Sequence, residues 1–98
     1  MALKVLWTLS AQKDRIRVFE YWNDRTKSRE YSQKLNSLIR HRISLIKEYP
    51  SAGLVTDKPS IRFHVIARNY KLFYKIVGET AYILRFWDTR QNPDNLDV

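Results

Sequence analysis

The sequence predicts an α+β fold in the order β-α-α-β-β-β, with a helical hairpin covering one face of a mostly antiparallel sheet. Residues 61–87 alternate apolar and polar side chains with the period of strands. Two earlier stretches carry apolar side chains at helical spacing, and a short alternating run precedes them. No repeat, linker or low-complexity stretch divides the 98 residues, so we expect a single domain over 1–98.

The first strand and the first helix are separated by a change of period near residue 10. Leu3–Thr8 alternates as a short strand, and Ser10 is the predicted N-cap of the helix that follows. Arg15 lies on the apolar face of this helix, so it needs a partner or an extended side chain that reaches water. The helix is predicted to end at Asn23-Asp24. Its apolar face consists of Ala11, Val18, Phe19 and Trp22.

The second helix is predicted over Ser28–Tyr49, and Pro50 ends it because proline disfavours a helical conformation in the residue before it. Its main stripe is Tyr31, Leu35, Leu38, Leu45 and Tyr49, with Ile39, Ile43 and Ile46 beside it. So wide an apolar face predicts packing on both the sheet and the other helix.

Three consecutive strands are predicted over 61–66, 70–77 and 81–87, after a loop over Ser51–Pro59. Asn69 supports the first connecting turn, and Gly78-Glu79 is short enough for a tight hairpin. Asn92-Pro93 opens a polar tail.

Composition indicates a soluble, intracellular protein with an acidic or polyanionic partner. Lys and Arg outnumber Asp and Glu by 18 to 10, for a formal charge of +8. So basic a small domain suits nucleic acid, or an acidic protein that covers its surface. The absence of cysteine excludes disulfides and thiolate metal sites, and fits the cytoplasm. The N-terminus does not read as a signal peptide, and no apolar run is long enough to span a membrane.

The three strands carry mostly basic polar positions, which predicts a cationic sheet face. Because burying unpaired Arg or Lys is costly, we expect the apolar sets to face the helices. The last strand is ambiguous, but the charge of Arg85 favours pointing Tyr82, Leu84 and Phe86 inward. The side chains then expected on the uncovered face are Arg62, His64, Lys71, Phe73, Lys75, Ile83, Arg85 and Trp87.

Such a face could bind nucleic acid or a protein. Its cations would neutralise phosphates, and Phe73 and Trp87 would stack on bases for roughly 1–3 kcal/mol each. Lys75 and Arg85 would contribute to the same surface. The alternative is that the exposed rings contact a partner protein, since exposed apolar surface also marks protein interfaces.

The order and spacing of these motifs resemble the RelE/ParE superfamily of toxins. The tract runs Arg62-x-His64, then Asn69-Tyr70-Lys71-Leu72-Phe73-Tyr74, then ILRFWDTR ending at Arg90. That superfamily pairs a basic strand with an "(Asn/Asp/Gly)-Tyr-(Arg/Lys)-aliphatic-x-Tyr" strand and closes on a strand that ends in Arg. The resemblance covers nearly the whole chain, because β-α-α-β-β-β is also the architecture of the family.

The resemblance implies the toxin of a type II toxin–antitoxin pair, often carried on plasmids or mobile elements, and a growth-arresting activity. A cognate antitoxin encoded in an adjacent gene would wrap the domain and block it. RelE-like members cut mRNA on the ribosome. ParE-like members inhibit DNA gyrase and have no nuclease chemistry.

The RelE-like alternative is the primary expectation, and it assigns a metal-independent endoribonuclease site with no cofactor. His64 would transfer the proton as general base or acid, since histidine titrates near neutrality. Arg62, Lys71 and Arg90 match family positions and would hold and neutralise the scissile phosphate.

The ParE-like alternative is favoured by two departures. Many RelE-like nucleases carry a Tyr or His shortly after the last-strand Arg, whereas residues 91–96 here contain neither. The run Ile83-Leu84-Arg85 is common in ParE-like chains. Outside this tract, Asp14 is expected to be a helix-dipole and solubility group, and His41 to belong to a solvated basic surface.

Overall fold

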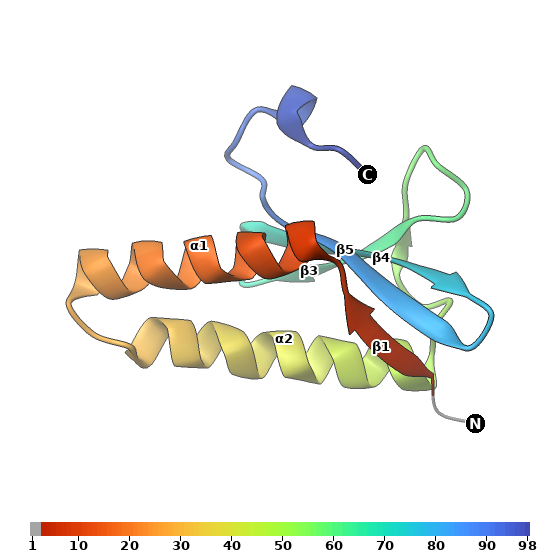
Figure 1. Ribbon diagram of the computed structural model, residues 1–98, viewed down its shortest axis with the longest axis horizontal. Helices are drawn as coiled ribbons and strands as arrows, with labels where there is room; N and C mark the ends of the chain where they lie inside the picture. Colours follow the sequence, from red (N-terminus) through yellow and green to blue (C-terminus); the bar gives the residue numbers. More distant parts are fainter. Residues whose placement is uncertain (1–2) are drawn as a thin grey trace.

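The computed structural model describes residues 3–98 and shows two helices packed on one face of a five-stranded mixed sheet (Figure 1). The elements are β1 (Lys4–Trp7), α1 (Leu9–Thr26), α2 (Glu30–Glu48), β2 (Leu54–Val55), β3 (Arg62–Ile66), β4 (Tyr70–Val77), β5 (Thr80–Asp88) and the short 3-10 helix η1 (Pro93–Asn95). The predicted α+β fold and element order are confirmed, and β2 is an addition within the predicted loop. No helix among residues 3–98 is both long and apolar enough to cross a membrane.

The sheet order is β1-β5-β4-β3-β2, so the first strand of the chain lies beside the last. β1 pairs parallel with β5, with Lys4 opposite Thr80 and Trp7 opposite Ile83. The other pairs are antiparallel. The tight hairpin at Gly78-Glu79 is confirmed, and Gly78 takes a φ of 60°, which glycine adopts without strain.

Helix α1 begins at Leu9 with Thr8 as its N-cap, so the prediction of Ser10 was wrong. The Thr8 hydroxyl accepts from the Ala11 N–H at 3.2 Å and donates to the Leu84 carbonyl at 3.0 Å, which ties the helix start to β5. The helix continues past the predicted end to Thr26 and stops where Lys27 adopts a φ of 55°. Arg15, for which a partner or an extended side chain was expected, contacts the Trp7 ring, whose centroid lies 4.1 Å from the guanidinium carbon.

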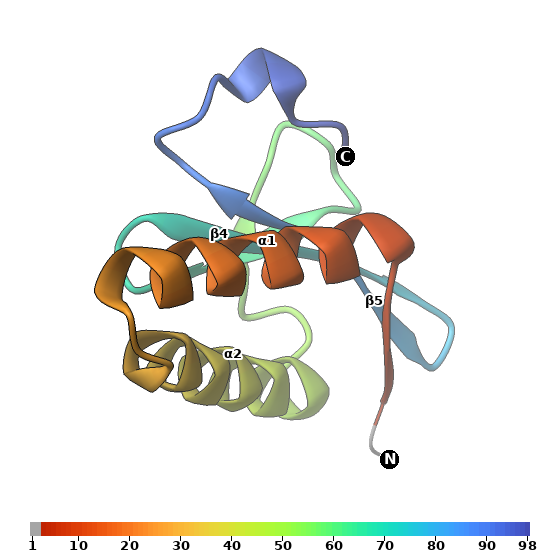
Figure 2. The same ribbon diagram turned by 60° about the vertical axis from the view of Figure 1, so that its left-hand side comes forward.

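Helix α2 buries a narrower stripe than the sequence predicts. Leu35, Ile39 and Ile46 have no exposed surface, whereas Leu38 and Tyr49 are exposed. The two helices run antiparallel as a hairpin (Figure 2), joined by a 2.6 Å hydrogen bond from the Ser32 hydroxyl to the Asn23 carboxamide oxygen.

Each sheet face has its own apolar cluster. The larger lies under the helices and includes Leu72, Tyr74 and Ile83, all fully buried. The smaller lies on the opposite face and is covered by the C-terminal segment, which contributes Leu96 and Val98. Figures 1 and 2 show this segment, in dark blue, on the side of the sheet away from α2. The second cluster comprises Ile61, Phe63, Phe73, Leu84, Trp87, Leu96 and Val98.

The loop after α2 is anchored on the phenol of Tyr74. The Tyr74 hydroxyl donates to the Pro50 carbonyl at 2.7 Å and accepts from the Gly53 N–H at 3.1 Å. A Cβ at Gly53 would lie 2.4 Å from the same hydroxyl oxygen, so only glycine allows this approach.

Candidate functional site

The pairing of β3 with β4 decides which strand residues face the helices. Ile66 lies opposite Tyr70, His64 opposite Leu72 and Arg62 opposite Tyr74. Because paired residues share a face, Arg62 and His64 lie on the helix-covered face. The prediction that both lie on the uncovered face was therefore wrong.

His64 is enclosed between the sheet and α2. It is 9% exposed, and its ring stacks on Tyr74 with centroids 5.7 Å apart. Its Nε2 is buried and has no hydrogen-bond partner among the described residues. Burial, with a smaller effect from the nearby Arg42, lowers the pKa of His64 below its ordinary value. A neutral imidazole is therefore favoured at this position.

Arg62 is held by backbone on the same face. Its Nη1 donates to the Gly53 carbonyl at 2.9 Å, in the loop that Tyr74 also anchors. This hydrogen bond satisfies the partly buried guanidinium and fixes the loop against β3. Arg62 was expected to hold a phosphate instead.

The remaining strand cations lie on the opposite face. Lys71 pairs with Val65 and extends over the Phe63 ring, with Nζ 4.5 Å from its centroid. Lys75 also lies on this face, one residue from the buried Tyr74. Lys71 and Lys75 are therefore where the alternation predicts them.

Phe73 and Trp87 face the same side but are only 4% and 6% exposed. Leu96 and Val98 pack against this cluster, so the two rings have little free surface for stacking. The expectation that they form an exposed stacking platform was wrong.

Arg85 is bound to α1, and the partner is a residue whose role sequence reasoning missed. Asp14 accepts from Arg85 Nε at 2.7 Å and Nη2 at 3.0 Å. It also accepts from the Phe86 backbone N–H at 3.1 Å. These hydrogen bonds to Asp14 raise the pKa of Arg85 and leave its side chain only 14% exposed.

The role of Asp14 follows from the sheet. β1 ends at Trp7 opposite Ile83, so the Phe86 N–H lies beyond the paired part of this edge, and α1 supplies its acceptor. Asp14 is 4% exposed, so its prediction as a surface group was wrong. The available signal was its spacing of three from Ala11 and four from Val18, on the apolar face of the helix.

The strand β5 does not keep a simple alternation. Phe73 pairs with Arg85 and Tyr74 with Ile83, so Leu84 is the extra residue of a β-bulge. Ile83 and Phe86 both enter the helix-side core, whereas Leu84 joins the opposite cluster. Neither of the two predicted arrangements of this strand is therefore correct.

Arg90 follows the end of β5 and is about half exposed. Its Nε and Nη2 donate to the Asp88 carboxylate at 2.9 and 2.8 Å. This contact lowers the pKa of Asp88 and raises that of Arg90. Beside it is a hollow of about 270 Å³, whose other walls are Arg17 and Tyr21 of α1 and Tyr70 of β4.

The four residues expected around one phosphate are thus divided. Arg62 and His64 lie under the helices, Lys71 on the opposite face, and Arg90 beyond β5 in an ion pair with Asp88. The structure does not bring them into one site.

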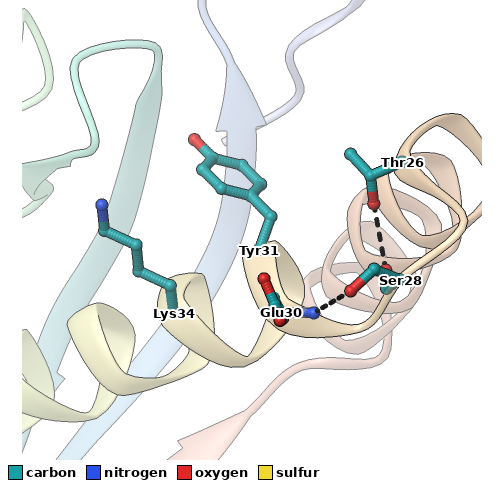
Figure 3. Close-up of a pocket in the computed structure, with 5 residues that line it drawn as sticks. All are labelled: Thr26, Ser28, Glu30, Tyr31 and Lys34. Carbon is teal, nitrogen blue, oxygen red and sulfur yellow. Dashed lines mark hydrogen bonds between the residues drawn. The ribbon is translucent and has the colours of Figure 1, made fainter.

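A second hollow, of about 350 Å³, lies at the turn between the helices (Figure 3). The Thr26 hydroxyl donates to the Ser28 carbonyl at 3.0 Å, and the Glu30 N–H donates to the Ser28 hydroxyl at 3.1 Å. Tyr31 and Lys34 complete its lining. None of the predicted site residues lies here.

Comparison with known proteins gives one family and several similar solved structures. Residues 5–93 match the family described as "ParE toxin of type II toxin-antitoxin system, parDE". The chain is similar in fold to the "Chromosomal ParDE TA system from P. aeruginosa", with a TM-score of 0.75, 18% identity, and coverage of 89% of this chain and 96% of that one. It is also similar to the "YoeB/ParE toxin from Agrobacterium tumefaciens", with a TM-score of 0.56, 23% identity, and coverage of 88% and 98%. No curated protein matches it.

Proposed function

This chain belongs to the ParE toxin family of type II toxin–antitoxin systems, and we propose that it arrests growth by binding DNA gyrase rather than by cleaving mRNA. The family membership implies an antitoxin partner. The formal charge of +8 suits an acidic surface on such a partner.

The separation of the predicted catalytic residues is the observation that carries the proposal. Metal-independent RNA cleavage needs a proton-transfer group and several cations around one phosphate. Here the His64 ring is 9% exposed and stacked on Tyr74, and Lys71 is on the other side of the sheet. A phosphate at Lys71 could not meet His64 without opening the fold.

Exposed apolar side chains on α1 support a protein target. Leu9 is 67% exposed and Ile16 is 54% exposed, and their spacing of seven residues, about two turns, places both on one side of the helix. Exposed apolar surface rimmed by charge is typical of protein-binding sites. Glu20 supplies such a charge on the same side.

The test measures both candidate activities with one toxin preparation. Purified toxin is added to gyrase and relaxed plasmid, and separately to a cell-free translation mixture whose mRNA 5′ ends are mapped. We expect loss of supercoiling with intact message. Cleaved message together with normal supercoiling would establish the nuclease and refute the proposal.

The variant Lys71→Ala separates the two activities further. It removes the cation at a family position that contributes least to the fold, since the Lys71 side chain has no hydrogen bond or ion pair among residues 3–98 and contacts the Phe63 ring. A gyrase inhibitor should keep activity within about threefold, whereas a nuclease that neutralises phosphate with Lys71 should lose roughly 100-fold or more. The circular dichroism spectrum checks that the variant is folded.

A further inference from the structure

The hollow beside Arg90 has one apolar wall and one polar rim. Val18 and Tyr70 form its wall, and Tyr70, which is only 2% exposed, is fixed by stacking on Phe86 at a centroid distance of 4.9 Å. The rim carries Arg17, Tyr21, Asp88, Arg90 and Gln91. A small adjoining hollow that shares Arg17 and Val18 extends it toward the buried Asp14. The volume of about 270 Å³ leaves room for a side chain of a partner.

Several donors at the rim have no acceptor within the described part of the chain. Arg17 is 67% exposed, and its nearest carboxylate oxygen, Asp14 Oδ1, is 3.8 Å away and already accepts from Arg85. Tyr70, in contrast, is only 2% exposed, and its hydroxyl oxygen accepts from Trp22 Nε1 at 2.8 Å. Tyr21 is half exposed. A ligand that accepts hydrogen bonds would therefore find donors already in place.

The charges around the hollow leave one positive charge uncompensated. Arg85 is paired with Asp14 and Arg90 with Asp88, both at hydrogen-bonding distance. Arg17 is the guanidinium left over. One carboxylate would neutralise it, and an Arg–carboxylate pair is strong when bidentate. A nucleic-acid backbone brings a charge at every phosphate and would meet Asp88 at the same rim, so it fits less well.

From these contacts we infer that the hollow binds a segment of the cognate antitoxin in which an acidic residue pairs with Arg17 and a neighbouring aliphatic or aromatic side chain packs against Val18 and Tyr21. The inference rests on the antitoxin partner that the family implies, and is independent of gyrase as the target. It names Arg17 and Tyr21 as affinity determinants, two residues outside the tract that carries the sequence resemblance.

The test compares charge reversals at two positions one turn apart on α1. Arg17→Glu places a negative charge at the rim, and Lys13→Glu makes the same change outside the residues that line the hollow. Affinity for the purified cognate antitoxin is measured by calorimetric competition, and thermal unfolding of each free toxin checks the fold. We expect Arg17→Glu to weaken binding roughly tenfold or more, Tyr21→Ala to weaken it similarly, and Lys13→Glu to change it by less than about threefold.

Charge-reversed antitoxins identify the pairing. Changing single Asp or Glu residues of the antitoxin to Lys should yield one variant that regains affinity for Arg17→Glu and loses it for the unchanged toxin. Equal weakening by Arg17→Glu and Lys13→Glu would overturn the inference, because it would indicate general charge attraction. It would also be overturned if Arg17→Glu weakened binding of a labelled single-stranded RNA oligonucleotide more than binding of the antitoxin. The measured quantity is affinity for the antitoxin and does not depend on gyrase inhibition. The proposal of gyrase as the target and the proposal of this antitoxin site can therefore be refuted independently.

Discussion

The two faces of the sheet are built from the same alternating strands but are closed in different ways. On the helix side, Leu72, Tyr74 and Ile83 are fully buried beneath α1 and α2. On the other side, Phe73 and Trp87 are covered by the C-terminal segment. Both faces of β4 carry apolar side chains, and both are covered. The burial of a strand residue therefore depends on which segment packs over its face.

The faces also differ in how they accommodate polar groups. The helix side contains Asp14, Arg62 and His64, and the first two are satisfied by specific hydrogen bonds to other elements or loops. The opposite side holds Lys71 beside an aromatic ring, where its charge can still reach water. Asp14 and Arg62 therefore position structure, whereas Lys71 contributes surface charge.

The largest effect should come from removing the carboxylate that joins α1 to β5. We expect Asp14→Ala to lower the free energy of unfolding by about 3–5 kcal/mol, because it leaves a mostly buried guanidinium and the Phe86 N–H without their acceptor. Urea unfolding followed by tryptophan fluorescence measures this. Asp24→Ala, on the exposed surface of the same helix, should change stability by about 0.5 kcal/mol or less. Equal effects would show that Asp14 acts only as a surface charge.

A pH dependence should follow from His64 on the helix side. Its pKa is lowered in the folded protein, so below the ordinary value of 6.5 the unfolded chain binds a proton that the folded chain does not. Stability should therefore be constant with respect to this group above about pH 7.5 and fall as the pH drops from about 6.5 toward its lowered folded pKa.

Urea midpoints across this pH range measure the dependence. His64→Gln should have a shallower decline than the unchanged protein, whereas His41→Gln, at an exposed histidine, should keep the full decline. If His64→Gln retained the same slope, the decline would have to arise from other groups, and His64 would not be the buried neutral residue described above.

The smallest effect on stability should come from a change in the C-terminal segment that covers the sheet face opposite the helices. Leu96→Ala should cost about 1 kcal/mol or less, because Leu96 is only partly buried. The matched change Leu72→Ala, on the helix side, should cost about 2–5 kcal/mol because that side chain has no exposed surface. A loss at Leu96 as large as that at Leu72 would mean that the two faces are equally integral to the core.

Sequence patterns predicted the helices and main strands because each has a clear period. They did not predict β2, since two residues are too few to show alternation. The wrong face for Arg62 and His64 came from assuming that polar side chains point to solvent. The length of the turn at 67–69 sets the register of β3 and β4. It places Ile66 opposite Tyr70 and therefore puts His64 on the same face as Leu72.

The remaining differences needed three-dimensional information. A bulge at Leu84 shifts the alternation of β5, and no local residue pattern marks it. Residues 92–98 form a polar tail with only two aliphatic side chains near its end. Such a pattern does not predict that the tail packs over the second sheet face. The carboxylate of Asp14 finds its partners about seventy residues away, a separation that periodicity does not report.

The parallel pairing of β1 with β5 has a consequence for synthesis on the ribosome. β1 is translated well before its strand partner, which begins at Thr80. The nascent chain therefore carries β1 unpaired until β5 has been made, and closure of the sheet waits for this long-range contact. Chains released early from an interrupted message would lack that partner, so this topology delays assembly of the complete toxin until its final strand has been made.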